Sequence, residues 1–150
     1  MSCFTTGVTV VTAHTQGQDW GMTCNSFNTV SLDPAMVLWS VRKTSLSHAA
    51  FINAGGYMVN VLSAQQKDLA LSFAQGTQQE RFAGQHLLRG INQHPRLEGV
   101  IAWFDCRIAQ VVSAGDHDIL IGEVIDFGGL AGHGLAYAQR SFGVLAALDD

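Results

Sequence analysis

Polar side chains crowd one strand-like segment, residues 21–34, which reads GMTCNSFNTVSLDP and ends in an Asp-Pro turn. Unpaired polar groups are costly in a protein core, so this segment must face water, pair with backbone or hold a polar ligand. The alternation of a strand would place Asn25 and Phe27 on one face and Cys24 and Ser26 on the other. Both faces are then partly polar, and either an exposed outer strand or a ligand-binding strand explains the pattern.

A second polar segment, SVRKTSLS at 40–47, ends one expected strand and opens an expected helix. It holds three serines, a threonine and two cations. Free backbone N–H groups at a helix start favour an anion, so the pattern is typical of a phosphate cradle. An ordinary helix cap beside solvated Arg42 and Lys43 is the alternative.

Three shorter motifs place a histidine or a cation beside turn-forming or aromatic residues. They are GDHD around His117, GHG around His133, and ERF with Arg81 and Phe82. Each motif could line a ligand pocket, because glycines allow close approach and these side chains offer donors or a ring. Surface turns and a packed loop end are the commoner explanation of such motifs.

The chain lacks the sequence motifs that identify several large enzyme classes. It has no GxGxxG, Walker, HExxH or GxSxG motif. Its six histidines are spread too widely to propose a metal site, so no metal is predicted. The net charge is −4 and the basic residues are scattered, which argues against a nucleic-acid partner.

The pattern of apolar and turn-forming residues predicts a chain made mainly of strands. β-branched and aromatic residues gather between Gly, Asp, Asn and Pro, which is typical of successive strands. The predicted strands are 7–13, 20–30, 35–42, 57–62, 99–112, 118–127 and 135–138. The first two form a hairpin around residues 15–19.

Two short helices are predicted between the strands. One begins near Thr44 or Ser45 and ends at the Gly55-Gly56 pair, and the other follows a capping box of Ser63 and Gln66. Without regular alternation of strand and helix, the fold class is mostly β, an antiparallel barrel with two inserted helices.

The bulk properties indicate one domain, residues 1–150, since a chain of this length has the size of one ordinary domain. Hydrophobic residues make up 47% and charged residues 13%, which favours a homo-oligomer that covers apolar surface. Three cysteines, Cys3, Cys24 and Cys106, form no CxxC pair and suggest a reducing compartment, the cytoplasm. The apolar runs are too short to span a membrane, and no signal peptide is evident.

These motifs, in this order and spacing, resemble the flavin reductase family, the small NAD(P)H:flavin oxidoreductases that serve two-component monooxygenases. The motifs that carry the resemblance are GVTVVTA, GMTCNSFNTVSLDP, SVRKTSLS, VNVLS, ERFAG, FDCRIAQ, GDHDI and GHGLAYAQRSF. It implies an FMN-binding split β-barrel of Greek-key type, which works as a homodimer with the flavin near the subunit interface.

The resemblance also implies where the cofactors bind. The flavin ring is expected to contact the polar segment, at Thr23, Cys24, Asn25, Ser26 and Ser31. The phosphate is expected at Ser40, Lys43, Thr44, Ser45 and Ser47, in agreement with the phosphate-cradle pattern.

A nicotinamide site is expected beside the flavin. Arg81 and Phe82 would reach the far end of the flavin or cover the nicotinamide. His133, Gly134 and Tyr137 would line its pocket. His117 is the expected catalytic residue. Either His117 or His133 would orient the carboxamide, and neither is required to exchange a proton in the hydride step.

The function implied is transfer of hydride from NADH or NADPH to FMN or FAD, with release of reduced flavin to a partner monooxygenase. The cofactors carry such chemistry, so no catalytic triad or metal is needed. Two alternatives stay open: an electron carrier of the flavoredoxin kind that keeps its flavin, and a reductase of ferric iron or a corrinoid.

Overall fold

Seven antiparallel strands form the main sheet of the structure, a computed structural model that describes residues 2–149. Their order across the sheet is β3-β2-β6-β9-β10-β5-β4. The strands are β2 (Thr9–Thr15), β3 (Gln18–Cys24), β4 (Asn28–Leu32), β5 (Ala35–Arg42), β6 (Gly56–Val61), β9 (Ala102–Ala114) and β10 (His117–Gly129). The mostly β, antiparallel fold class is confirmed.

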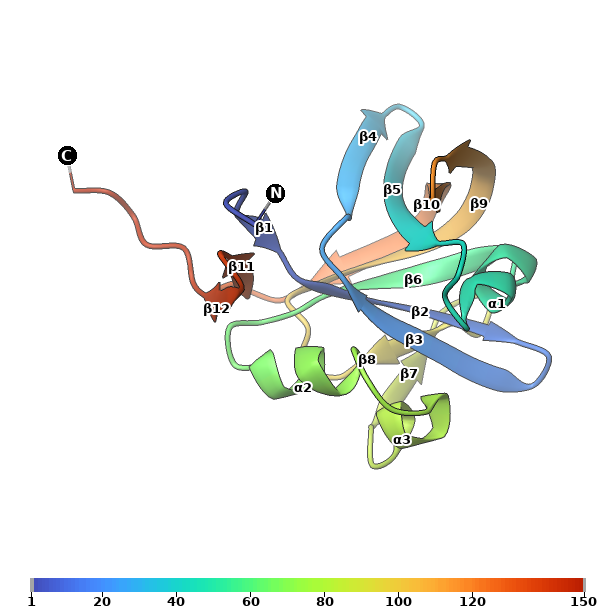
Figure 1. Cartoon of the computed structure of the whole chain (residues 1–150), viewed down its shortest axis with the longest axis horizontal. Coiled ribbons are helices and arrows are strands. Elements are labelled where there is room, and N and C mark those ends of the chain that lie inside the picture. The colour runs from blue at the N-terminus through green and yellow to red at the C-terminus, as the bar shows by residue number, and fades with distance from the viewer. Residues whose placement is uncertain (1, 150) are drawn as a thin grey trace.

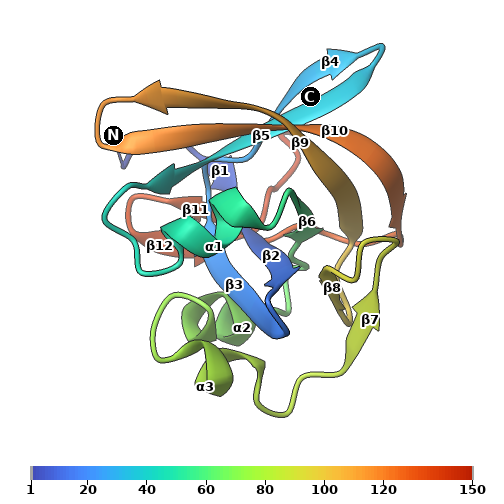
Figure 2. The same cartoon turned by 90° about the vertical axis from the view of Figure 1, so that its right-hand side faces the viewer.

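The sheet has the non-consecutive order of a Greek key. β5 leads to β6 along the chain, but β9 and β10 lie between these two strands in the sheet. Figures 1 and 2 show the sheet curled, with the β4–β5 hairpin on one side and helices α2 and α3 on the other. The two outer strands, β3 and β4, are also consecutive in the chain, so the connection between them joins the borders of the sheet.

Two smaller sheets complete the β structure. β1 (Thr6–Gly7), β11 (Ala136–Ala138) and β12 (Ser141–Gly143) form one, and β7 (Leu87–Arg89) pairs with β8 (Pro95–Leu97) in the other. The predicted strand at 135–138 matches β11, whereas β7, β8 and β12 were not predicted. After β12 the chain leaves the body of the protein as an extended tail (Figure 1).

The prediction of one strand over 20–30 is wrong, because the chain breaks it after Cys24 and resumes as β4 at Asn28. The hydroxyl of Ser26, in the break, accepts from the Ser40 N–H at 3.0 Å and lies 3.3 Å from the Ser40 carbonyl oxygen, to which it donates. A side chain therefore takes the place of strand pairing at this point of β5.

Three helices are present in residues 2–149, where two were predicted: α1 (His48–Asn53), α2 (Lys67–Ser72) and α3 (Gln78–Phe82). None of them is long and apolar enough to cross a bilayer. α1 begins after the predicted start near Thr44, because residues 43–47 form a turn in which the Ser45 and Ser47 hydroxyls bond to each other at 3.0 Å. α3 was missed, although the Glu80 N–H donates to Thr77 Oγ1 at 3.1 Å, a cap that the sequence TQQE already indicates.

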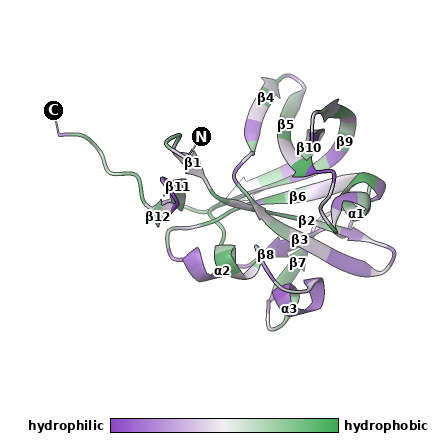
Figure 3. Cartoon of the chain, in the orientation of Figure 1, coloured by the Kyte–Doolittle hydropathy of each residue, from purple (hydrophilic) through white to green (hydrophobic). Residues whose placement is uncertain are grey.

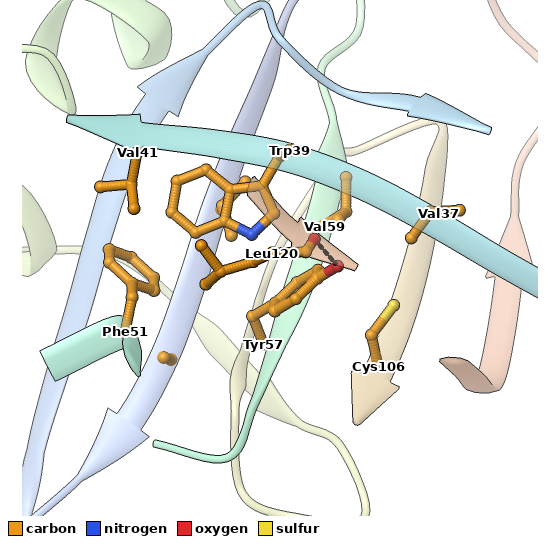
Figure 4. Packing of buried hydrophobic residues seen from close by; sticks show 10 residues of the cluster. Val37, Trp39, Val41, Phe51, Tyr57, Val59, Cys106 and Leu120 are labelled. Carbon is orange, nitrogen blue, oxygen red and sulfur yellow. Dashed lines mark hydrogen bonds between the residues drawn. The ribbon is translucent and has the colours of Figure 1, made fainter. Parts of the chain in front are cut away.

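Two apolar clusters stabilise the fold. In the first, the ring of Trp39 on β5 packs edge-on against Phe51 of α1 at 4.8 Å, and the Tyr57 hydroxyl donates to the Leu120 carbonyl (Figure 4). In the second, Phe73, just after α2, packs with Val10 of β2 and Leu97 of β8. Full burial of one such side chain stabilises the fold by about 1.5–3 kcal/mol. Figure 3 shows hydrophilic residues along α3, so this helix meets solvent on one side.

β3 runs between the two clusters and presents a different face to each. Trp20 and Met22 pack against the first cluster, whereas Gly21 lies against the rings of Phe73 and Phe82 in the second. The strand is thus fixed from both sides where the candidate site forms.

Candidate functional site

A cavity of about 1010 Å³, here called the main cavity, opens beside β3. Its floor is β3. One side, the loop wall, comprises residues 42–47, and the other, the helix wall, comprises residues 73–81. Its volume lies at the upper end of the range for ligand pockets, large enough for a cofactor.

Ten of the predicted site residues come together around the main cavity, from four separate parts of the chain. They are Thr23, Cys24, Asn25, Ser26, Ser40, Thr44, Ser45, Ser47, Arg81 and His117. The antiparallel pairing of β5 with β10 sets Arg42 opposite His117, although the two residues are far apart in the sequence. The polar segments singled out in the sequence therefore share one space.

The end of β3 supplies polar groups that are partly used by the fold. The Thr23 hydroxyl donates to the Ala70 carbonyl of α2 at 2.6 Å, and Thr9 Oγ1 lies 3.1 Å from Cys24 Sγ. Burial raises the pKa of the Cys24 thiol, so this group is a neutral wall rather than a nucleophile. Asn25 is exposed, and its side-chain amide has no protein partner among residues 2–149. Asn25 is thus the free donor and acceptor of this segment.

The loop wall presents hydroxyl groups to the cavity. Ser45 and Ser47 bond to each other, and the Ser47 hydroxyl also approaches Met22 Sδ at 3.8 Å. The Thr44 hydroxyl has no partner within the described part of the chain. Short neutral hydroxyls at the mouth of a cavity suit the oxygen atoms of a polar ligand.

Two contacts attach this part of the chain to the β9–β10 hairpin, one from the loop wall to the turn before β10 and one from the start of α1 to β10 itself. The Lys43 N–H donates to the Asp116 carbonyl at 2.9 Å, and His48 Nε2 lies 2.7 Å from Asp118 Oδ2. His117 stands between these contacts at the start of β10, half-buried, with Nδ1 2.7 Å from Asp116 Oδ1. The second ring nitrogen of His117, which lines the cavity, has no hydrogen-bond partner in residues 2–149.

The helix wall is attached to β3 through side chains of α3. Gln78 Oε1 accepts from the Gly21 N–H at 2.8 Å, and Arg81 Nη1 donates to the Gly21 carbonyl at 2.8 Å. A Cβ at Gly21 would lie 2.7 Å from the ring of Phe73, so only glycine allows this approach. Burial lowers the pKa of Arg81, but a guanidinium stays charged throughout the physiological range.

Six predicted site residues lie outside the main cavity: Ser31, Lys43, Phe82, His133, Gly134 and Tyr137. Ser31 is on β4, paired with Met36 of β5. Lys43 Nζ donates to Ser113 Oγ at 2.6 Å, and the Phe82 ring packs edge-on against Phe73. The positions of these three are explained by strand pairing, by a side-chain hydrogen bond and by core packing.

The three other residues predicted for the nicotinamide pocket lie outside the main cavity. His133 is exposed, and Gly134 forms a β-bridge with Ser63. Tyr137 lines a second cavity of about 350 Å³. That cavity shares Thr23, Cys24 and Asn25 with the main cavity, so Tyr137 lies near the same end of β3.

Several lining residues were not predicted from the sequence, chiefly Trp20, Met22, Arg42 and Gln78. Trp20 and Met22 share a strand face with Cys24, so extending that alternation toward the N-terminus would have found them. Gln78 follows the TQQE cap signal, which marks the start of α3. Arg42 was noticed only as part of a cationic pair.

These groups fit a flavin. The main cavity is large, it offers the free amide of Asn25 and the free hydroxyl of Thr44, and its lining includes two arginines. Neutral hydrogen-bonding groups suit the ring edge and the ribityl hydroxyls, and the polar loop wall suits a phosphate.

Comparison with known proteins gives consistent matches. The family model described as "Flavin reductase like domain" matches residues 1–146. The reductase component of a flavin-dependent trigonelline monooxygenase from Acinetobacter baylyi is 44% identical over 140 residues, which are 93% of this chain and 45% of that protein. An FMN reductase (NADH), SmoA, from Agrobacterium fabrum is 43% identical over 145 residues, which are 95% of this chain and 81% of that protein.

A solved structure has the same fold. The NADH:FAD oxidoreductase SgcE6 of Streptomyces globisporus superimposes with a TM-score of 0.92 at 34% identity, covering 99% of this chain and 85% of that one. This chain spans less than half the length of the Acinetobacter relative and most of the length of the other two proteins.

Proposed function

Because the chain belongs to the flavin reductase family, we propose that it is an NAD(P)H-dependent flavin reductase that supplies reduced flavin to a partner monooxygenase. The flavin is FMN or FAD and the hydride donor is NADH or NADPH. Among the relatives, one is named an FMN reductase (NADH) and another an NADH:FAD oxidoreductase, which supports NADH and either flavin.

One observation carries the proposal: the polar segment and the loop wall, far apart in the sequence, face the same main cavity. A flavin nucleotide needs polar contacts at the edge of its ring and hydrogen-bond donors at its phosphate. The free amide at the end of β3 suits the ring edge, and the hydroxyls of the loop wall suit the phosphate. No nucleophile with an adjacent base is needed, because bound flavin itself accepts hydride from a nicotinamide.

In this proposal the residues of the chain bind and orient. Asn25 and the backbone near Ser26 hold the polar edge of the ring, and the hydroxyls of Thr44, Ser45 and Ser47 meet the phosphate side. His117 orients the nicotinamide carboxamide from the rim. Trp20 and Met22 provide the apolar surface that keeps water from the ring.

A homodimer is part of the proposal. Several large apolar side chains lie on the surface: Val30 and Leu32 on β4, Phe127 and Leu130 at the end of β10, and Leu145 and Leu148 in the C-terminal tail. Leu32 is 95% exposed and Leu148 is 94% exposed. Covering such groups with a second copy would remove them from water.

The monooxygenase partner and the cellular location are proposals of the same kind. Relatives named as reductase components of a trigonelline monooxygenase and of a stachydrine N-demethylase support an oxygenase as the consumer of reduced flavin. Three free cysteines, Cys3, Cys24 and Cys106, support the reducing cytoplasm.

The direct test is the oxidation of NADH under anaerobic conditions, with and without added FMN, FAD or riboflavin. We expect turnover that requires added flavin and bleaches its visible absorbance. Turnover independent of free flavin would contradict the proposal in favour of a carrier with bound flavin. Faster reduction of ferric iron or a corrinoid would identify that acceptor instead.

A matched pair of variants ties this activity to the main cavity. Asn25→Ala should raise the KM for flavin about tenfold, because it removes the free amide beside the ring. Asn28→Ala, on β4 outside the cavity, is the control and should leave the KM within about twofold. Equal changes in the two variants would show that the ring binds elsewhere.

A further inference from the structure

The two ends of the loop wall are attached to the protein in different ways. At its start, Arg42 pairs with His117 in the ladder between β5 and β10. At its end the chain enters α1 at His48, and His48 Nε2 lies 2.7 Å from Asp118 Oδ2 on β10. Strand pairing fixes the first end, whereas a contact between two side chains fixes the second.

The Asp118 side chain faces the interior of the barrel. Leu120, two positions further along β10 and on the same face, is fully buried. The side chains of Asp118 and His48 are 13% and 24% exposed. A carboxylate accepts hydrogen bonds and donates none, so His48 Nε2–H is the donor in this contact. No other hydrogen bond reaches the Asp118 carboxylate within residues 2–149, so loss of the imidazole would leave a largely buried acceptor unsatisfied.

The hydrogen bonds inside the loop wall give the turn its shape. The Ser45 N–H donates to the Arg42 carbonyl at 3.0 Å, and the His48 N–H donates to the Ser45 carbonyl at 3.1 Å. Toward the floor of the cavity, the Ser47 hydroxyl approaches Met22 Sδ at 3.8 Å, and a thioether sulfur is a weak acceptor. Local bonds of this kind do not place the turn relative to β3 or β10. Its position is therefore set mainly at its two ends.

The first turn of α1 has little support besides the contact with Asp118. Its N-cap residue, Ser47, makes no side-chain capping bond, and its hydroxyl is instead paired with that of Ser45. A helix of six residues is not stable on its own. Phe51 anchors this helix in the core, but it lies one turn further along. The bond between His48 and Asp118 is therefore what fixes the start of α1.

The contact between His48 and Asp118 lies behind the lining of the main cavity. Neither residue lines the cavity, whereas residues 44–47 and His117 do. Residues 44–47 directly precede His48 in the chain, and His117 directly precedes Asp118. The pair thus connects two lining segments, and its loss would alter the spacing between them. A displacement of about 1 Å is enough to weaken a binding site.

We propose that His48 is a positioning residue for the flavin: its hydrogen bond to Asp118 holds the loop wall at the distance from His117 that the bound flavin requires. This role rests on the proposed function, which places the flavin in the main cavity. His48 itself contacts neither flavin nor nicotinamide. Its removal should therefore weaken flavin binding and leave the hydride-transfer step of the filled site unchanged.

The test compares His48→Ala with His48→Gln, with FMN binding measured by the quenching of flavin fluorescence. His48→Ala removes the donor, and we expect FMN to bind about tenfold more weakly. The side-chain amide of glutamine keeps an N–H donor, so His48→Gln should bind FMN within about threefold of the wild type. Alanine favours the helix more than histidine does, so a loss in His48→Ala does not come from a weaker α1.

Steady-state oxidation of NADH separates positioning from a merely structural role. A destabilised protein with an intact site contains less active enzyme, which lowers the apparent kcat and leaves the KM for flavin unchanged. A displaced loop wall has the opposite effect. For His48→Ala we expect the KM for flavin to rise about tenfold and kcat to stay within about twofold of the wild type.

Two controls tie the effect to this pair of side chains. Combining His48→Ala with Asp118→Ala removes donor and acceptor together, so the double variant should bind FMN no more weakly than His48→Ala alone. His14→Ala removes a similar, partly buried contact, in which His14 Nδ1 lies 2.8 Å from Asp19 Oδ1. These two residues face each other in the β2–β3 ladder, whose backbone bonds already hold both strands, so His14→Ala should change FMN binding by less than about twofold.

Four outcomes would overturn the proposal. They are a lower kcat for His48→Ala at an unchanged KM for flavin, equal weakening of FMN by His48→Gln and His48→Ala, equal weakening by His14→Ala, and losses for His48→Ala and Asp118→Ala that multiply in the double variant. FMN binding is read without NADH. A wild-type protein that binds FMN but does not oxidise NADH would therefore contradict the proposed reductase activity alone.

Discussion

Arg42 and Arg81 line the same cavity from different walls, and their surroundings differ. Arg81 donates to two backbone carbonyls and holds α3 against β3. Arg42 has no such partner in residues 2–149 and stands beside the free N–H groups of Thr44 and Leu46. In the helix wall, Gln78 and Arg81 both bond to Gly21 of β3, whereas in the loop wall the Arg42 guanidinium and the Thr44 hydroxyl have no protein partner in residues 2–149. A residue type in a cavity lining therefore does not by itself identify a ligand contact.

The largest effect on stability is expected when the buried packing behind the helix wall is removed. Phe73 is fully buried beneath Gly21, so Phe73→Ala should lower the free energy of unfolding by about 4 kcal/mol. Leu46 of the loop wall is 98% exposed, and Leu46→Ala should change that energy by less than about 0.5 kcal/mol. Urea denaturation measures both, and comparable losses would refute the distinction between the walls.

Acid should loosen the β2–β3 hairpin, and with it the floor of the cavity. Burial lowers the pKa of His94 to about 4, and its Nδ1 accepts from the His14 N–H at 3.0 Å. The folded pKa lies below the usual value of about 6.5, so His94 contributes stability above that pH and loses it as the pH falls toward about 4. Between about pH 7.5 and about pH 5 the expected loss is about 2 kcal/mol.

The His94→Gln variant isolates this effect. Burial raises the pKa of Asp105, which acts with the opposite sign, so the wild-type curve alone mixes the two groups. Denaturation at both pH values should show a smaller loss in His94→Gln than in the wild type. Parallel curves would exclude His94 as the cause.

A smaller effect is expected at the contact between α3 and β3. Arg81→Met keeps much of the side-chain length but removes the donor to the Gly21 carbonyl, and should cost about 1.5 kcal/mol. Because Arg81 acts through β3, binding of FMN and riboflavin should weaken by the same factor. Selective weakening of FMN would instead make Arg81 a phosphate contact and remove the contrast with Arg42.

Much of the fold could be predicted from the sequence, because alternation and turn residues are local signals. β5 matches its predicted range of 35–42, and β10 contains the predicted 118–127. The strand predicted over 20–30 failed because its interruption depends on Ser26 meeting Ser40, a contact between distant segments. Strand propensity alone cannot reveal such a contact.

The candidate site was predictable to a similar degree. Motifs near residues 23–26 and 44–47 were found, because many small polar side chains at a strand end and a helix start are unusual. The different use of Lys43 and Arg42 was not predictable, since adjacent cations look alike in a sequence. The two cations differ because Lys43 donates to Ser113, which is seventy residues away in the sequence, whereas Arg42 does not.

The attachment of α3 to β3 also bears on how this protein behaves at high concentration. β3 is the last strand of the main sheet, and its outward Gly21 and Thr23 N–H groups are occupied by Gln78 and by the Phe73 carbonyl. An uncovered sheet border of this kind pairs readily with another chain. Detachment of α3 would free the Gly21 N–H and uncover this part of β3 for pairing with another chain. α3, which closes one side of the cavity, thus also covers the edge strand β3 and disfavours its pairing with another chain.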